Sequence, residues 1–338
     1  MIRVAGRSLL ATHHTPRSAT NMNAHATIRR GIHRLAGVVL FAVIGAAAHA
    51  EPTVAESQGP ALTQLSFASA KAAADAFVAA LGSDDTGQLD ALFGPQYAKF
   101  EPTDKLSAEV ERKQLAKAAQ EALLLREDAP DRITLVLGAQ AWPFPIPIVE
   151  RNASWRFDTA AGIEELQNRI VGAHELAAID LARRYVAAQA EYASEDRDGD
   201  QVLEYAQRIA STPGQQDGLH WESKDGDASP FGPFVADAGD FAKGRRVGDP
   251  FRGYYFKVLK RQGPHPPGGA YDYVINGNMI AGFALLAWPA DYGVSGVMTF
   301  VVNQRGKVFQ KNLGPKTSAI AAALTRYDPD ASWTEVTQ

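Results

Sequence analysis

The 338-residue sequence contains no cysteine. The chain can therefore form no disulfide, no thiolate metal site and no thiol nucleophile. Histidine is also scarce, because beyond residue 50 only His174, His220 and His265 remain, far apart in the sequence. This spacing disfavours a histidine-rich zinc site. A chain of this composition must be stabilised by its hydrophobic core, and its length is sufficient for one.

The glycine-rich stretches lack the patterns of phosphate-binding loops. No G-x-G-x-x-G or P-loop pattern follows a predicted strand, and Gly268, Gly269 and Gly277 lie in predicted turns. The segment 293–296 is not a G-x-S-x-G nucleophile elbow, and no histidine lies near Ser295 in the sequence. We therefore expect neither phosphate binding nor serine-dependent hydrolysis.

The first 50 residues have the pattern of a secretory signal peptide. A basic region ends at Arg34, an apolar run covers residues 35–47, and Ala48-His49-Ala50 is an A-x-A cleavage signal. The apolar run is short for a membrane span. We predict cleavage after Ala50, with an uncleaved N-terminal anchor as the alternative, and no transmembrane segment after cleavage.

Cleavage would change the charge of the chain. Residues 1–50 hold six arginines and no acidic residue, so their removal leaves 28 basic and 38 acidic side chains, a net charge of −10. This charge argues against nucleic acid and anionic membrane as partners. The charge is typical of an exported protein, so we expect a periplasmic or secreted location. We also expect an envelope partner, which the sequence does not identify.

Turn residues and hydrophobic periodicity divide the remainder into a flexible leader, residues 51–65, and two domains. The N-terminal domain, 66–160, has predicted helices at 67–81, 88–93 and 109–126 and extended segments at 132–137, 142–148 and 154–157. The three prolines within 142–148 cannot donate ladder hydrogen bonds, so that segment should lie at an edge or a bulge. The order of helices and strands predicts an α+β domain and is similar to the nuclear-transport-factor-2-like pattern.

The C-terminal domain, 161–335, begins with a long amphipathic helix at 163–193, which Gly172 could interrupt. A short helix at 202–210 and irregular chain at 211–253 follow. Strands are predicted at 254–260, 271–275, 282–288, 297–303 and 307–311, with a hairpin turn at Arg305-Gly306 and a last helix at 316–327. We expect the long helix to pack on an antiparallel sheet, which again gives an α+β fold.

Several long strings occur in order between residues 67 and 333 and together resemble one bacterial family. They include W-P-F-P-I-P, W-R-F-D-T-A-A-G, E-Y-A-S-E-D-R-D-G-D, G-G-A-Y-D-Y-V-I-N-G, A-W-P-A-D-Y-G-V-S-G-V-M-T-F and D-P-D-A-S-W. On these strings the chain is identified as a member of the exported family called domain of unknown function 2950. Membership implies no established activity and supplies no catalytic residues.

The C-terminal half has a second resemblance. A helix leading into Y-A-S, then G-Y-Y-F, A-W-P and T-F-V-V-N-Q-R-G-K-V is similar to the head domains of type IV pilins and pseudopilins. The resemblance implies one long helix on an antiparallel sheet. The chain departs from pilins because its long helix is amphipathic and follows another domain, so the resemblance concerns fold and not pilus assembly.

The stretch E-Y-A-S-E-D-R-D-G-D-Q-V-L-E-Y, residues 191–205, carries the most specific chemical signal. Calcium prefers six to eight oxygen ligands on a tightly turning loop. With Ser194 as position 1 of an EF-hand-like loop, Asp196 and Asp198 occupy positions 3 and 5. Asp200 adds a carboxylate, and Glu204 is one residue early for the closing ligand. The sequence predicts a calcium loop, with a solvated acidic turn in which Asp200 caps the next helix as the alternative.

Two weaker patterns keep other functions open. Asp272 and Asp291 could form a carboxylate pair for glycoside cleavage, although acids at strand ends are more often turn formers. The aromatic residues of the β-rich half could line a groove for a peptide or glycan, or fill the core. We interpret the protein as a non-catalytic binding or structural component of the cell envelope. The alternative is a hydrolase that acts on an envelope polymer through Asp or Glu.

Overall fold

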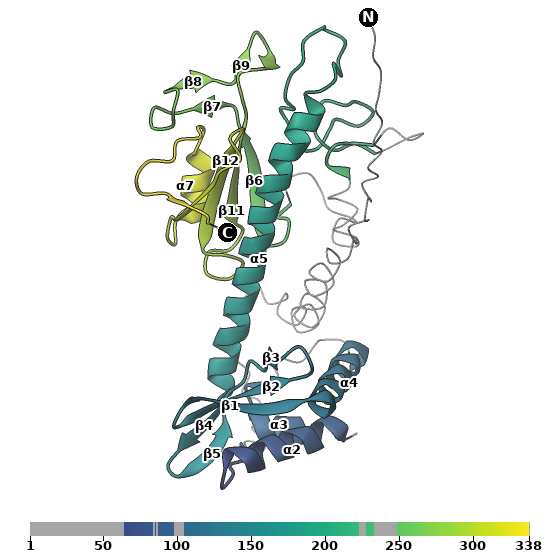
Figure 1. Cartoon of the computed structure of the whole chain (residues 1–338), viewed down its shortest axis with the longest axis vertical. Helices are drawn as coiled ribbons and strands as arrows, with labels where there is room; N and C mark the ends of the chain where they lie inside the picture. Colours follow the sequence, from purple (N-terminus) through teal and green to yellow (C-terminus); the bar gives the residue numbers. More distant parts are fainter. Residues whose placement is uncertain are drawn as a thin grey trace, which may run out of the picture. The chain divides into compact units, whose positions relative to one another are not determined.

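The computed structural model describes residues 64–83, 85, 87–97, 105–222, 228–232 and 249–337 (Figure 1). The predicted signal peptide and nearly all of the predicted leader lie outside these residues. The chain divides between Ala160 and Ala161 into two compact units, each with its own hydrophobic core. Both units combine helices with antiparallel strands, which confirms the α+β class. Among the described helices, none has the length and apolar character needed to cross a membrane.

The N-terminal unit places three helices against one antiparallel sheet. The helices are α2 (Ala70–Gly82), α3 (Gly87–Phe93) and α4 (Lys105–Glu121), and the strands are β1 (Leu123–Ala129), β2 (Arg132–Leu137), β3 (Trp142–Pro143), β4 (Ile148–Arg151) and β5 (Ser154–Phe157). The strand order is β1-β2-β4-β5, and β3 pairs with β2. The proline-bearing segment forms only this short strand before β4 begins, as its missing N–H donors predict.

One face of this sheet carries the core. Ile133 pairs with Ile148, and Ile148 pairs with Phe157, so their side chains lie on the same face. They pack with Phe77 of α2 and Phe93 of α3, whose ring centroids are 5.9 Å apart in an edge-to-face arrangement. The opposite face of the sheet therefore carries the alternate residues of the same strands.

The predicted helix at 109–126 is wrong at its C-terminal end. Helix α4 stops at Glu121, and residues 123–129 form β1, which pairs with β2 from Leu123↔Leu137 onward. Leucine, arginine and glutamate favour helices locally. Pairing with the buried strand β2 overrides that preference, because it places Leu125 beside the core.

The C-terminal unit is built around α5 (Thr159–Tyr192) and a five-stranded antiparallel sheet. The strands of this sheet are β6 (Tyr254–Leu259), β11 (Ala284–Pro289), β12 (Met298–Asn303), β13 (Val308–Asn312) and β14 (Thr334–Glu335), in the order β14-β13-β12-β11-β6. Two small hairpins add β7 (Arg261–Gln262) with β8 (Tyr271–Asp272), and β9 (Val274–Ile275) with β10 (Asn278–Met279). Helix α7 (Thr317–Ala323) completes the unit. Helix α5 continues through Gly172 without interruption.

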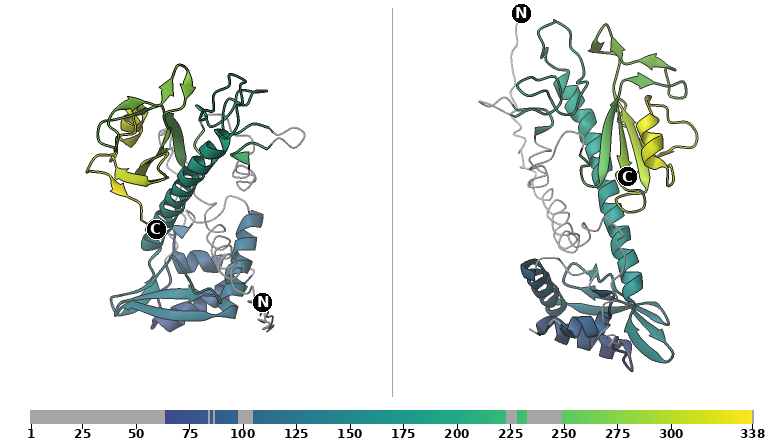
Figure 2. Two further views of the ribbon diagram at one scale, coloured as in Figure 1. Left: turned by 45° about the horizontal axis from the view of Figure 1, so that its top comes forward. Right: turned by 180° about the vertical axis from the view of Figure 1, so that it is seen from behind.

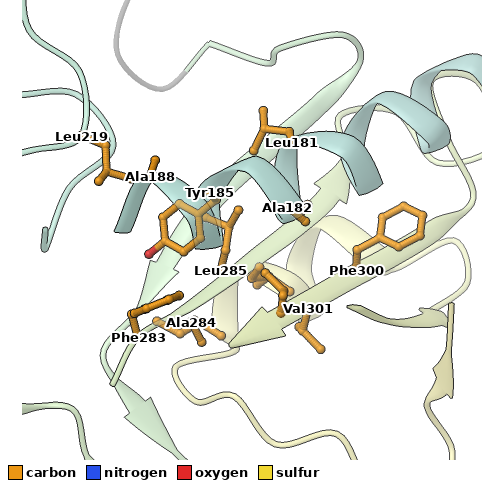
Figure 3. Packing of buried hydrophobic residues seen from close by; sticks show 14 of the residues in the cluster. Leu181, Ala182, Tyr185, Ala188, Leu219, Phe283, Ala284, Leu285, Phe300 and Val301 are labelled. Atoms are coloured by element: carbon orange, nitrogen blue, oxygen red, sulfur yellow. The ribbon is translucent and has the colours of Figure 1, made fainter. Parts of the chain in front are cut away.

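Helices α5 and α7 lie on opposite sides of this sheet (Figure 2). Coverage on both sides explains why β11 is buried almost throughout rather than at alternate residues. Figure 3 shows Ala182 and Tyr185 of α5 facing the sheet residues Leu285 and Phe300. The predicted packing of the long helix on the antiparallel sheet is present in this core.

A fully buried glutamine joins α5 to a distant segment. The Gln189 side chain donates from Nε2 to the Tyr185 hydroxyl and to the Ala206 carbonyl, each at 2.8 Å. Its Oε1 accepts from the Ala206 N–H at 2.8 Å. Gln189 and Tyr185 are both 0% exposed, and burial raises the pKa of Tyr185. One side chain therefore satisfies both backbone groups of Ala206.

The predicted helix at 202–210 is absent. Tyr205 donates its backbone N–H to Met279, and Ala206 donates to Gln189, so neither bonds within a helical turn. The predicted helix at 316–327 is also too long, because α7 ends at Ala323. Tyr327 instead exchanges backbone hydrogen bonds with the β7 segment at Arg261 and Gly263. In both segments tertiary hydrogen bonds replace the helical ones that the local sequence favours.

Replacement of Gln189 by methionine should destabilise the C-terminal unit by about 3 kcal/mol. Methionine conserves the side-chain volume but leaves the Ala206 N–H and C=O buried without partners. The free energy of unfolding in urea measures the effect. Glu191→Met, on an exposed position of the same helix, should change that energy by less than about 0.5 kcal/mol. Equal losses in the two variants would show that the Gln189 hydrogen bonds contribute nothing.

Candidate metal centre

The acidic loop follows directly on the C-terminal end of α5. Asp196, Asp198 and Asp200 are exposed, and one carboxylate oxygen of each lies within 4.8 Å of the others. Gly199 has a φ of 79° and Gln201 a φ of 68°, two left-handed residues that turn the backbone sharply. The predicted spacing thus brings the three aspartates together on a tight turn.

The loop is ordered by its own carboxylates. Asp196 accepts the backbone N–H of Gly199 at 2.8 Å and that of Gln201 at 2.9 Å. These two hydrogen bonds lower the pKa of Asp196, so its carboxylate stays ionised in mildly acidic solution. Asp198 accepts only a longer bond, 3.3 Å, from the Asp200 N–H. Asp196 is therefore the residue that shapes the loop.

Arg197 holds the middle of the loop against the body of the unit. Its guanidinium carbon lies 5.2 Å from the ring centroids of both Tyr192 and Trp221, and its Nε donates to the Tyr192 carbonyl. Only 9% of its side chain is exposed. The side chain thus packs inward while its two aspartate neighbours are exposed. Its positive charge offsets part of the carboxylate repulsion and reduces the attraction for a cation.

The remaining predicted ligands have other partners. The Ser194 hydroxyl donates to the Glu191 carbonyl at 2.7 Å, and Glu204 accepts the Met279 N–H at 2.8 Å. Glu204 does not belong to the group of converging carboxylates that the described residues form. Asp200 caps no helix; it accepts the Val202 N–H and the Asn278 side-chain amide instead.

The chemistry of the donors suits a hard cation. Carboxylate oxygens are the ligands that Ca²⁺ prefers, and the three aspartates would supply three of the six to eight oxygens it takes. The other positions would be filled by water or by further oxygens of the exposed loop. A site with few protein ligands belongs at the weak end of the calcium-binding range.

The other predicted acids lie on separate segments, one on a strand and one in a turn. Asp272 on β8 pairs with Arg261 at 3.0 Å, with both side chains exposed. Asp291 follows β11, where its backbone N–H donates to the Ser295 hydroxyl at 2.9 Å. The Asp272 carboxylate thus pairs across two strands, while Asp291 has the backbone hydrogen bonds of a turn residue.

The structure places a histidine beside Ser295 that sequence distance does not suggest. The Nδ1 of His174 lies 2.9 Å from the Ser295 carbonyl oxygen, and burial lowers the pKa of this histidine. The Ser295 hydroxyl donates instead to the Asp291 carbonyl. Because the histidine contacts the backbone and not the hydroxyl, the pair has the geometry of a structural contact between α5 and this turn.

The loop hydrogen bonds predict unequal effects of two substitutions. Asp196→Ala removes the acceptor of the Gly199 and Gln201 amides, so both amides should exchange with solvent several-fold faster. Asp198→Ala removes only a long bond and should leave both rates nearly unchanged. Hydrogen exchange followed by NMR measures the exchange rates of the Gly199 and Gln201 amides in both variants. Similar acceleration by the two substitutions would contradict the assignment of loop order to Asp196.

Acidification should act in the same direction as Asp196→Ala. The folded-state pKa of Asp196 is lowered, so its contribution is present above the unfolded value and is lost as the pH falls through the folded value. Protection of the Gly199 and Gln201 amides, corrected for intrinsic exchange, should therefore persist through the ordinary titration range of an aspartate and be lost at lower pH, as the Asp196 carboxylate is protonated. Protection that is already lost above the ordinary pKa of an aspartate, or that never changes on acidification of the folded protein, would show that the Asp196 carboxylate is not the acceptor that orders the loop.

Comparison with known proteins gives one match. No curated protein and no solved structure matches the chain. The resemblances to pilin heads and to nuclear-transport-factor-2-like domains thus remain resemblances of sequence pattern. A family model described as "protein of unknown function (DUF2950)" matches residues 64–336, which include both units and the acidic loop. The chain belongs to this family.

Proposed function

We propose that the protein is an exported, non-catalytic binding or structural component of the cell envelope whose C-terminal unit is stabilised by calcium. The observation that carries the proposal is the convergence of the Asp196, Asp198 and Asp200 carboxylates within 4.8 Å on an exposed turn. The signal-peptide pattern of residues 1–50 supports the location. The periplasm and the exterior both supply millimolar divalent cations, the range in which a site of few ligands is occupied.

Electrostatics favours an ion at this turn. Three carboxylates close together repel one another, and a divalent cation among them replaces this repulsion with attraction. The backbone already has the required curvature, because Asp196 and the left-handed residues Gly199 and Gln201 hold it. Little conformational entropy would therefore be lost on binding.

The alternative, a carboxylate-dependent hydrolase, receives less support. That reaction requires two carboxyl groups facing each other across a cleft. The Asp272 carboxylate instead pairs with Arg261, and Asp291 belongs to a turn that its backbone closes by hydrogen bonds with the Ser295 hydroxyl. Among the described residues, the acids that converge as a group of three are the exposed aspartates of the loop, an arrangement suited to holding a cation.

Calcium should raise the melting temperature of the protein, because the ion binds the folded loop and not the unfolded chain. At a calcium concentration about one hundred times the dissociation constant, the gain should be about 2.7 kcal/mol. Magnesium should stabilise less, since it requires nearly octahedral geometry and retains its water. Calorimetry measures the melting temperature of the protein in chelator, in magnesium and in calcium.

The double variant Asp196→Asn, Asp198→Asn should lose the calcium-dependent increase. A matched control, Asp180→Asn with Glu191→Gln, removes two exposed negative charges from α5 and should keep it. An unchanged melting temperature of the wild-type protein in millimolar calcium would eliminate the site. A loss of the increase in the control as well would indicate a general charge effect.

Export makes a separate prediction. Protein recovered from the periplasm or the medium should begin at Glu51, because the A-x-A signal places cleavage after Ala50. Mass spectrometry of the N-terminal peptide measures this. Recovery of intact residues 35–47 in the membrane fraction would instead support the uncleaved anchor.

A further inference from the structure

We propose that the N-terminal unit binds a small organic anion, a carboxylate on a short apolar body, in a cavity at the β5 edge of its sheet. The cavity has a volume of about 270 Å³. It lies among β4, β5, the beginning of α5 and the turn that follows α3. No residue of the acidic loop lines it, so the proposal is independent of calcium.

The strand register places arginines on the face of the sheet opposite the helices, and the cavity is lined by residues of both faces where they meet at the β5 edge. Val149 on β4 pairs with Arg132 on β2 and with Arg156 on β5, so the three side chains form a row across the sheet. Arg151 lies two residues beyond Val149 and shares that face. Ile148, next to Val149, points to the helix-covered core. Strand alternation therefore separates an apolar face from a face that carries arginines.

Arg156 is the charge available to a ligand. Arg151 lines the same cavity but already pairs with Asp131, with its Nη1 3.0 Å from a carboxylate oxygen. Arg156 makes no ion pair with any residue that the structure describes. With Arg151 paired to Asp131, the lining offers the Arg156 guanidinium beside one acid, Asp158, so the ligand should carry no more than a single negative charge.

The remaining wall of the cavity combines the polar residues Gln64, Gln96 and Thr159 with apolar residues. It includes Phe93, Pro95, Val149 and Phe157, of which the phenylalanines and the valine are buried. The volume is slightly below the range of about 300–1,000 Å³ that holds drug-sized ligands, so a molecule of a few carbons fits. A guanidinium binds a carboxylate through two parallel hydrogen bonds, and the apolar part of the wall suits a short hydrocarbon chain. Inorganic phosphate would use only the first of these two features.

Hexanoate and its neutral counterpart hexanamide test the proposal. The two molecules have nearly the same shape and differ in the charge that Arg156 would recognise. Ligand-observed NMR titration of the purified protein at low salt, without added calcium, gives both affinities. Hexanoate should bind with a dissociation constant of about 1 mM, and hexanamide about tenfold more weakly.

Three variants locate the site. Arg156→Gln should weaken hexanoate binding about tenfold and abolish the preference over hexanamide, while Arg156→Lys should retain part of it. Arg132→Gln is the matched control, because Arg132 lies on the same face of the sheet but outside the cavity. Unchanged melting temperatures verify that each variant is folded. The proposal is overturned if hexanoate does not bind, if it binds no better than hexanamide, or if Arg132→Gln and Arg156→Gln weaken binding equally.

Discussion

The buried amide of Gln189 is the constraint on which the C-terminal unit depends. It lies one turn before the end of α5 and bonds to both backbone groups of Ala206. The acidic loop between these residues is thereby closed at its base. A glutamine in the core is costly unless every polar atom has a partner, and here its amide groups bond to Tyr185 and Ala206. The end of the loop is in turn joined to the β10 hairpin, because Met279 accepts the Tyr205 N–H and donates its own N–H to Glu204. Hydrogen bonds therefore join the helix, the loop and the hairpin in addition to apolar packing.

The shape of the loop follows from this closure. With both ends fixed, residues 193–205 must reverse direction over a short distance, and Asp196 supplies the acceptors for the turning backbone. Arg197 packs inward between Tyr192 and Trp221. The neighbouring aspartates then cluster at the surface, where their repulsion is tolerable in water and an ion could relieve it. The inward packing of Arg197 and the exposure of the aspartates on either side of it are therefore properties of the same loop.

Local pattern predicted the elements whose partners are nearby or whose periodicity is strong. The strand at 132–137 has the predicted bounds, and α5 differs from the predicted helix by a few residues. Strand β1 and the segment after Asp200 were predicted wrongly, because their form depends on β2, Gln189 and Met279, which are distant in sequence or unremarkable in type. The spacing of the aspartates predicted their convergence. The sequence did not indicate that the Glu204 carboxylate accepts the backbone N–H of Met279, because any residue type offers such a donor.

Terbium luminescence can show whether the acidic loop holds a cation. Tb³⁺ substitutes for calcium at oxygen sites and emits when a nearby tryptophan transfers energy to it. Trp221 packs on Arg197, in the middle of the loop. We expect saturable emission from one ion per chain on tryptophan excitation. Calcium should displace the terbium, and the double variant Asp196→Asn, Asp198→Asn should lose the emission. Absence of sensitised emission from the wild-type protein, or emission that the double variant retains, would contradict this expectation.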